Sequence, residues 1–184
     1  MKLIILDRDG VINKDSDAYI KSPEEWVPIP GSLEAITKLN RAGYTVTVAS
    51  NQSGIARGYF DLQALAAMHR KMDDMLAQLG GRVEGVFFCP HGPRDKCLCR
   101  KPQPGLLQDI SRRFSAPLDE VIFVGDTIKD LMCARNAGAR PVLVKTGKGE
   151  RTLLEKDAEG FTNVPVFANL AEVVDALLDR ELET

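Results

Sequence analysis

Five short apolar runs, separated by longer segments with helical spacing, constrain the possible folds of this chain more than any other feature. Each run holds four to six mostly apolar residues, as is typical of strands that are buried on both faces of a parallel sheet. We therefore expect five strands, at Lys2–Leu6, Tyr44–Ala49, Gly85–Phe88, Val121–Val124 and Pro141–Val144.

The segments between the runs carry the spacing of amphipathic helices. Leucine and methionine recur at three or four residues from Leu62 to Leu79, and Asp61 stands where a helix N-cap is expected. A second apolar stripe runs from Leu170 to Leu178. Strands that alternate with helices build right-handed βαβ units. The sequence therefore predicts an α/β fold, with an open parallel Rossmann-like sheet, helices on both faces and no large cap domain.

Composition and charge exclude several classes of function. The formal net charge is −2 and 6% of the residues are aromatic, so we expect no nucleic-acid partner. No apolar run reaches the roughly 18 residues of a membrane span, and the N-terminus lacks the pattern of a signal peptide. For a chain of 184 residues we expect a single domain over 1–184, a monomer without a membrane partner, and a cytoplasmic location with reduced cysteines.

Polar side chains follow the predicted strands, at the edge of the sheet where ligands bind in such folds. Asp7 and Asp9 follow the first strand, Ser50 ends the second, Lys101 follows the third, and Asp126 ends the fourth. Asp-x-Asp-Gly alone is also ordinary turn chemistry. Together, however, these groups supply a nucleophile, a proton donor and positive charge. Hydrolysis of a phosphate monoester requires all three.

A metal ion is expected at the same edge. Enzymes accelerate phosphate monoester hydrolysis by up to ~21 orders of magnitude, which at about 1.36 kcal/mol per decade is roughly 28 kcal/mol. A single lysine cannot supply that much. Hard oxygen ligands such as Asp7 and Asp126 suit Mg²⁺.

In their order along the chain, these residues resemble the four signatures of the haloacid dehalogenase-like hydrolases. The resemblance implies that Asp7 attacks phosphorus and becomes an aspartyl-phosphate, and that Asp9 is the general acid and then the base. It further implies that Ser50 and Lys101 hold the phosphoryl oxygens, and that Mg²⁺ sits on the Asp7 carboxylate, the Asp9 backbone carbonyl and Asp126. The matching segments are Asp7-Arg8-Asp9-Gly10-Val11, Ser50-Asn51, Lys101 and Gly125-Asp126.

The histidines do not offer an alternative base. The chain has two; His69 falls in the middle of a predicted helix, where a packing or surface role is expected, and His91 belongs to a metal-ligand cluster. A carboxyl group must therefore carry the proton. Asp130 follows Asp126 by one helical turn, and two roles remain open for it. It either orients Lys101 or faces solvent.

Residues 89–99 hold this second group of metal-ligand side chains. Three of the four cysteines and one of the two histidines lie here, and a closed Cys₃His set is typical of a structural zinc site. The alternative is a loop with incidental thiols. A zinc clip inserted at this point would fix the loop that carries the next two residues, Arg100 and Lys101, toward the substrate. The expected ligands are Cys89, His91, Cys97 and Cys99, whereas Cys133 is expected in the core.

Two kinds of phosphatase within the resembled superfamily share this cysteine pattern. One acts on a heptose 1,7-bisphosphate, in the ADP-heptose route to lipopolysaccharide core, and the other on histidinol phosphate. The segment from Ser50 to Gly58 resembles the heptose type, so the favoured small-molecule partner is a sugar phosphate, and histidinol phosphate is the alternative.

Several residues are expected to contact that substrate. Arg57 and Arg100 suit bidentate contact with a second phosphate, and a solvated surface charge is the alternative for each. The loop from Asp15 to Tyr19 resembles the family's substrate-contacting segment, with one extra residue. The full expected set is Asp15, Tyr19, Asn51, Gln52, Ser53, Arg57, Arg100 and Lys101.

A non-catalytic phosphate-binding module is the alternative of another class. Asn or Ser at position 7 or 9 would favour such a module, whereas Asp7 and Asp9 are both present. A zinc-dependent interaction protein would leave the phosphate-site residues unexplained. The sequence therefore favours a magnesium-dependent phosphatase.

Overall fold

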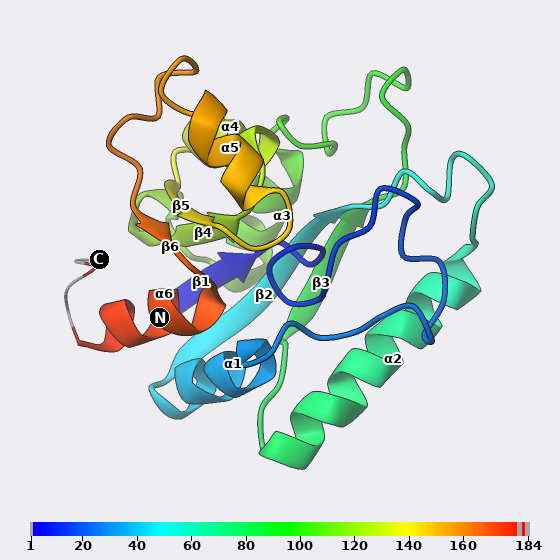
Figure 1. The fold of residues 1–184 in the computed structure, drawn as a ribbon, viewed down its shortest axis with the longest axis horizontal. Coiled ribbons are helices and arrows are strands. Elements are labelled where there is room, and N and C mark those ends of the chain that lie inside the picture. Colours follow the sequence, from blue (N-terminus) through cyan, green and yellow to red (C-terminus); the bar gives the residue numbers. More distant parts are fainter. Residues whose placement is uncertain (1, 180–181, 183–184) are drawn as a thin grey trace.

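The five predicted apolar runs pair as parallel strands, and a sixth short strand joins them (Figure 1). The computed structural model describes residues 2–179 and 182. Within them the strand order is β3-β2-β1-β4-β5-β6, and every strand pair is parallel. The strands are β1 (Lys2–Leu6), β2 (Tyr44–Asn51), β3 (Gly85–Cys89), β4 (Ile122–Gly125), β5 (Arg140–Val144) and β6 (Val166–Phe167).

The observed strands differ from the predicted ones mainly at their ends. β2 extends through Asn51, so Ser50 lies inside the strand and not at its last residue. The short strand β6 was not predicted, because a strand of two residues is too short to show a pattern of apolar residues in the sequence. It is held by its register against Leu143 and Val144 at the edge of the sheet.

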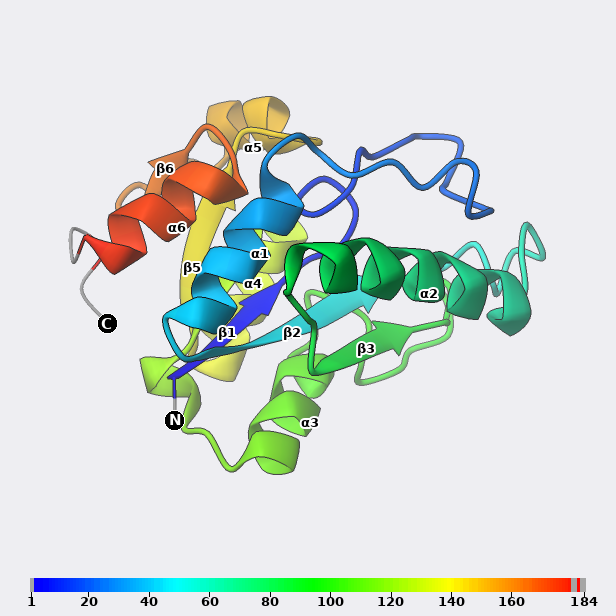
Figure 2. The ribbon, with the colours of Figure 1, turned by 90° about the horizontal axis from the view of Figure 1, so that it is seen from below.

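Helices cover both faces of the sheet, as the sequence predicts (Figure 2). One face packs against α1 (Ser32–Arg41), α2 (Leu62–Leu79) and α6 (Leu170–Leu178). The other packs against α3 (Gly105–Phe114) and α4 (Ile128–Ala137). A 3₁₀ turn at Leu118–Glu120 precedes β4, and α5 (Gly149–Glu155) follows β5.

The alternation of side chains along β1 divides the core into two layers. Ile4 and Leu6 pack among residues of α1, α2 and α6, whereas Leu3 and Ile5 pack among residues of α3 and α4. Successive side chains of a strand point to opposite faces. An uninterrupted apolar run is therefore what a central strand with two covered faces requires.

Two predicted details of the helices are confirmed. The Asp61 carboxylate caps α2 by accepting a 2.8 Å hydrogen bond from the Ala64 amide. The thiol of Cys133 is fully buried in the core against α3. No helix in the described part of the chain is long and apolar enough to cross a membrane.

The sheet order brings the functional segments together. β1 lies between β2 and β4, so the chain reverses its direction of winding beside β1. A crevice forms at such a switch point, outside the carboxyl ends of the strands. Residues 7–31 and 90–104, which follow β1 and β3, carry no helix or strand beyond isolated bridges. Both loops start at this edge.

Candidate active site

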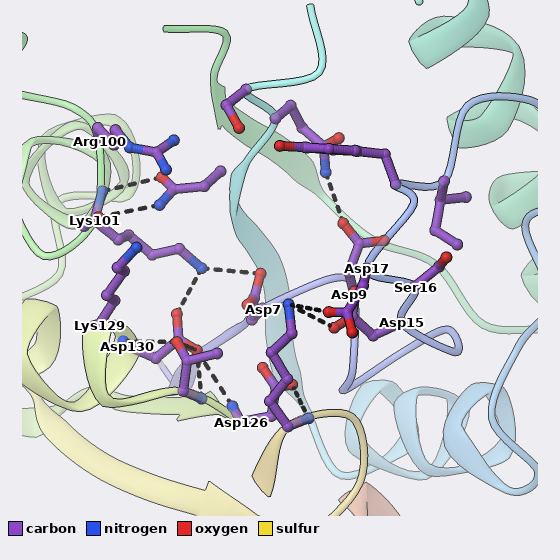
Figure 3. Close-up of a pocket in the computed structure, with 17 residues that line it drawn as sticks. Asp7, Asp9, Asp15, Ser16, Asp17, Arg100, Lys101, Asp126, Lys129 and Asp130 are labelled. Atoms are coloured by element: carbon purple, nitrogen blue, oxygen red, sulfur yellow. Dashed lines mark hydrogen bonds and ion pairs between the residues drawn. The ribbon is translucent and has the colours of Figure 1, made fainter. Parts of the chain in front are cut away.

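A pocket lies at the carboxyl ends of β1, β2 and β4, where the sequence predicts the site (Figure 3). Both acidic and basic side chains line it, and they come from the loop after β1, the end of β2, the loop before α3, the start of α4 and the segment after β5. Its lining residues are Asp7, Asp9, Asp15, Ser16, Asp17, Tyr19, Ile20, Asn51, Gln52, Ser53, Arg100, Lys101, Asp126, Thr127, Lys129, Asp130 and Lys148.

The Lys101 ammonium is held in a fixed position at the floor of the pocket. Its Nζ lies 2.9 Å from Asp7 Oδ1 and 2.7 Å from Asp130 Oδ1, and it donates to the carbonyl of Ala49 at 2.9 Å. Burial alone would lower the pKa of Lys101, but the Asp130 and Asp7 carboxylates raise it above its usual range. Lys101 therefore stays charged, with each of its three N–H donors assigned to an acceptor.

Of the two roles left open for Asp130, orienting Lys101 or facing solvent, the structure supports the first. Its side chain is 1% exposed, so it does not face solvent. Oδ2 accepts from the Thr127 amide at 3.0 Å and from the Thr127 hydroxyl at 2.7 Å, which caps α4. Oδ1 is thereby directed at Lys101, and we conclude that Asp130 orients Lys101.

Asp7 lies where its carboxylate is difficult to keep charged. Burial and the neighbouring Asp130 carboxylate raise the pKa of Asp7 to about 8, against the opposing effect of Lys101. Its Oδ1 also accepts a 2.7 Å bond from the Arg8 amide. The pocket thus concentrates more negative charge around Asp7 than Lys101 neutralises. A bound cation would relieve this imbalance.

The surroundings of Asp9, in contrast, stabilise its charged form. Burial alone would raise its pKa, but the Arg8 guanidinium and hydrogen bonds from Asn13 and Gln52 hold the pKa of Asp9 below its usual value. Asn13 Nδ2 donates to Oδ1 at 2.8 Å, and Gln52 Nε2 donates to Oδ2 at 2.9 Å. Before any phosphate adds its charge, Asp9 is therefore ionised at neutral pH.

The end of β2 contributes three linked side chains. The Gln52 amide that contacts Asp9 also donates to Ser50 Oγ at 2.8 Å. Asn51 exchanges two hydrogen bonds with the Lys101 backbone, at 3.0 and 3.1 Å. The Asn51 side chain therefore anchors the segment that carries Lys101, although the sequence indicated only a substrate contact for it.

Asp126 has the features of a cation ligand. It is 1% exposed, and its Oδ1 is buried without a hydrogen-bond partner among the described residues. Burial, followed by the Asp130 and Asp7 carboxylates, raises the pKa of Asp126 well above its usual value. An added Cβ at Gly10, where φ is +87°, would lie 2.1 Å from Asp126 Oδ2. Only glycine therefore lets the loop after β1 approach this carboxylate.

The residues present fit a magnesium ion. Carboxylate oxygens of Asp7, Asp126 and Asp130 lie within 4.8 Å of one another. Asp130 is already engaged by Lys101 and Thr127, which leaves Asp7 and Asp126 as the carboxylates with unused oxygen capacity. Hard oxygen donors are the ligands that Mg²⁺ prefers.

The four predicted zinc ligands come together at the end of β3, whose last residue is Cys89, and in the loop that follows it. Cys89 Sγ lies 3.4 Å from His91 Nδ1 and 3.6 Å from Cys97 Sγ, and His91 Nδ1 lies 3.3 Å from Cys99 Sγ. Tetrahedral zinc, with bonds of about 2.3 Å to sulfur and about 2.0 Å to nitrogen, separates its ligand atoms by about 3.5–3.8 Å. The arrangement is therefore a possible metal site of the predicted composition.

Two cations beside the pocket, Arg100 and Lys129, have no anionic partner within the part of the chain that the structure describes. Arg100 donates to the His91 carbonyl at 3.2 Å, which ties it to the cysteine loop. Neither Arg100 nor Lys129 forms an ion pair with any residue in the described ranges. Burial, Arg100 and Lys148 together lower the pKa of Lys129. Positive charge is thus left available on the side of the pocket next to Lys101.

The loop after β1 closes the opposite side of the pocket. Asp15 Oδ2 lies 3.2 Å from Lys148 Nζ, which joins this loop to the segment after β5. Tyr19 lines the pocket, and its ring packs at a tilt against the ring of Tyr59, 5.1 Å away between centroids. Arg57, an expected substrate contact, is not among the lining residues; its guanidinium lies 5.9 Å from the Tyr19 ring centroid.

Sequence reasoning missed Lys129 and Lys148 as pocket residues. Lys148 comes shortly after β5. The expectation that functional residues follow the strands could therefore have identified it, had it been applied to the fifth predicted strand. Lys129 carries no such signal, because a lysine in the first turn of a helix is ordinarily a solvated charge.

Fold and site together define a phosphatase of the haloacid dehalogenase-like class. Residues 98–173 match the family model described as HAD-hydrolase-like. The D-glycero-β-D-manno-heptose-1,7-bisphosphate 7-phosphatase of Pseudomonas aeruginosa is 55% identical over 96% of this chain and 97% of its own length. The chain therefore belongs to the D-glycero-β-D-manno-heptose-1,7-bisphosphate 7-phosphatase family within that class.

Solved structures agree with this assignment. The D,D-heptose 1,7-bisphosphate phosphatase of Bordetella bronchiseptica, complexed with magnesium and phosphate, is 53% identical, with a TM-score of 0.93 over 98% of this chain and 99% of that one. The corresponding enzyme of Burkholderia thailandensis is 43% identical, with a TM-score of 0.75 over 97% and 99%.

Proposed function

We propose that this protein is a magnesium-dependent phosphatase that removes the 7-phosphate of D-glycero-D-manno-heptose 1,7-bisphosphate. The products are heptose 1-phosphate and inorganic phosphate, in the ADP-heptose route to lipopolysaccharide core. The names of relatives at 50–56% identity support this substrate. The single structural observation that carries the proposal is the buried Asp7, 2.9 Å from Lys101 in a pocket rich in carboxylates.

The first half of the reaction transfers the phosphoryl group to Asp7. A carboxylate oxygen of Asp7 forms a bond to phosphorus while the bond from phosphorus to the sugar O7 breaks. Asp9 donates its proton to the departing O7. Because the phosphate brings further negative charge close to Asp9, substrate binding raises the pKa of Asp9 and favours the protonated form that this step needs.

The second half regenerates the free carboxylate. Asp9, now ionised, accepts a proton from a water molecule as the water oxygen attacks phosphorus, and the bond from phosphorus to the Asp7 oxygen breaks. Ser50 and Lys101 hold the phosphoryl oxygens throughout. The Gln52 amide, 2.8 Å from Ser50 and 2.9 Å from Asp9, keeps these two groups in a fixed relation.

Magnesium would be held by the Asp7 and Asp126 carboxylates and by the backbone carbonyl of Asp9. When bound, it would supply positive charge against the phosphoryl oxygens. The unpartnered Oδ1 of Asp126 and the raised pKa of Asp7 support this placement.

We further propose that the loop cluster binds structural zinc through Cys89, His91, Cys97 and Cys99. Four protein ligands leave zinc no open coordination position, as in sites that stabilise a fold. The hydrogen bond from Arg100 to the His91 carbonyl supports a positioning function for the clip, because it connects a proposed zinc ligand to a cation beside the pocket. The clip would thereby position Arg100 and Lys101.

The cations beside the pocket favour a bisphosphate over histidinol phosphate as the substrate. Arg100 and Lys129 are the cations beside the pocket without an anionic partner in the described residues, and together they match a second dianion. Histidinol phosphate carries an ammonium group in place of that dianion, so these two residues would repel it. Arg57 reaches the pocket only through Tyr19 and has a secondary role.

The remaining expectations are part of the same proposal. A single sheet runs through the described residues, which supports one phosphatase domain over 1–184 with the segment 89–99 inserted. A sugar-phosphate substrate made and used in biosynthesis suits a cytoplasmic location, and we propose a monomer.

Phosphate release from heptose 1,7-bisphosphate and from histidinol phosphate, measured side by side with and without Mg²⁺, tests the proposal. We expect a large preference in kcat/KM for the bisphosphate, dependence on Mg²⁺, and loss of turnover in Asp7→Asn with the fold retained by circular dichroism. Faster hydrolysis of histidinol phosphate would reassign the substrate. Turnover retained by Asp7→Asn would exclude the covalent mechanism, and binding without turnover in the unaltered protein would favour a phosphate-binding module.

A further inference from the structure

Arg8 lies between the two catalytic aspartates in the sequence, and the proposed reaction assigns it no role. Its side chain is fully buried. Placing a guanidinium in the interior is costly unless it is paired and hydrogen-bonded. The residues that pair with Arg8 therefore indicate its purpose.

One partner of Arg8 is the carboxylate of Asp9. Arg8 Nη2 lies 2.9 Å from Asp9 Oδ1 and 3.1 Å from Oδ2, and Nε lies 3.1 Å from Oδ1. A planar guanidinium that contacts both oxygens determines the plane of the carboxylate as well as its distance. With Asn13 added, Oδ1 accepts from three N–H donors, counting Arg8 Nε and Nη2 separately. Oδ2 accepts from two N–H donors, Arg8 Nη2 and Gln52 Nε2, and is the less occupied of the two oxygens.

The other partner of Arg8 is a histidine on α2. His69 Nε2, on α2, lies 3.3 Å from Arg8 Nη1. Arg8 has only donors, so the ring nitrogen must accept and the proton of the neutral imidazole lies on Nδ1. Burial, followed by the Arg8 charge, lowers the pKa of His69 to about 4, so the ring is neutral at pH 7. Phe88 of β3 packs against it at 6.5 Å between centroids.

We propose that Arg8 and His69 are positioning residues for the proton transfer by Asp9. His69 holds Arg8, and Arg8 holds the Asp9 carboxylate so that Oδ2 meets the departing sugar oxygen. In that step the bond from Asp9 Oδ2 to hydrogen breaks as the bond from O7 to hydrogen forms and the bond from phosphorus to O7 breaks. The inference rests on the proposed role of Asp9 as the proton donor.

The leaving group provides a test that separates positioning from a structural role. A sugar alkoxide needs a proton in order to leave, whereas the nitrophenolate of p-nitrophenyl phosphate leaves without one. The ratio kcat/KM reports only the steps up to transfer of phosphorus to Asp7, so slow hydrolysis of the intermediate does not affect it. A misplaced Asp9 should therefore slow the bisphosphate and spare the aryl ester.

We expect Arg8→Met to lower kcat/KM about 100-fold on heptose 1,7-bisphosphate and less than about 5-fold on p-nitrophenyl phosphate, within the range of general acid catalysis. His69→Phe should lower the bisphosphate value about 10-fold with the same bias. His69→Gln should recover most of it, because the amide oxygen can accept from Arg8. Arg70→Gln, on the exposed side of the same helix, is the matched control and should change neither substrate.

Equal losses on the two substrates in both His69→Phe and Arg8→Met would overturn the inference. If Arg8→Met does not fold, the variants His69→Phe and His69→Gln decide the question, because the His69 ring is only partly buried.

Asp9→Asn separates this inference from the proposed function. A loss in Asp9→Asn that is equal on both esters would overturn the donor role of Asp9. Suppose instead that Asp9→Asn slows the bisphosphate more than the aryl ester, but that His69→Phe and Arg8→Met do not. Only the positioning role of Arg8 and His69 would then be overturned.

Discussion

Asp130 Oδ1 lies 2.7 Å from Nζ of Lys101, and both side chains are almost fully buried. The pair joins the first turn of α4 to the loop that precedes α3. Because Thr127 holds the other oxygen of Asp130, the carboxylate cannot turn away from the lysine. Asp130 therefore sets the position of Lys101 although it need not touch the substrate.

We predict that Asp130→Asn lowers kcat by up to about 100-fold, the order of loss expected when a catalytic group is misplaced by about 1 Å. Asp7 still neutralises Lys101 in this variant, so the free energy of unfolding should fall by less than the about 3–5 kcal/mol of a broken buried ion pair. Phosphate-release assays and urea unfolding measure the two quantities. Asp175→Asn removes an exposed ion pair with Lys38 and serves as the control. An unchanged kcat in Asp130→Asn would contradict the orienting role.

Removing the zinc clip should reduce both stability and activity. In Cys97→Ser we expect the zinc content, measured by plasma mass spectrometry, to fall from about one ion per chain to near zero. The melting temperature should fall with it, and so should kcat/KM, because Arg100 is bonded to the His91 carbonyl. Cys133→Ala is the matched control, since this thiol is buried outside the cluster. If zinc-free protein kept full activity and stability, the clip would have no role in positioning.

Arg100 and Lys129, the two cations beside the pocket, should distinguish a bisphosphate substrate from a monophosphate. Arg100→Ala and Lys129→Ala should each raise KM for heptose 1,7-bisphosphate by about 10- to 100-fold, since a hydrogen bond to a charged group contributes about 1.5–3 kcal/mol. On heptose 7-phosphate, which lacks the second dianion, the same variants should change KM little. Arg57→Ala should have a smaller effect than either. Equal effects on the two sugars would place the second phosphate elsewhere.

Stability should depend on pH through His69. The folded-state pKa of about 4 lies below the ordinary value of 6.5. The unfolded chain therefore binds a proton more readily between these values, and the stability due to the neutral ring is lost as pH falls from about 6.5 to about 4. At about 1.36 kcal/mol per pKa unit the effect is about 3 kcal/mol. Urea unfolding of the unaltered protein and of His69→Gln, at pH 7.5 and 4.5, should show the larger loss in the unaltered protein. Parallel losses would contradict the assignment.

The strands and the residues after them could be predicted because they depend on local pattern. The apolar run Lys2–Leu6 identifies a strand that is covered on both faces, and Asp7 follows at its end. The cysteine loop could be identified in the same way, because its four possible metal ligands fall within eleven residues. Strand ends were less predictable. Ser50 lies inside β2 because pairing with β3 extends that strand to Asn51, and this pairing is not a local property.

The sequence by itself thus determined the fold class, the edge of the sheet at which the pocket lies and the composition of a possible Cys/His metal site, since each follows from spacing along the chain. Only the tertiary structure decided that Asp130 faces Lys101, that Lys129 lies beside Arg100 at the pocket, and that His69 contacts Arg8 across 61 positions of sequence. These contacts depend on how α2 and α4 pack against the sheet. Packing is a property of the whole core, and no local pattern in the sequence encodes it.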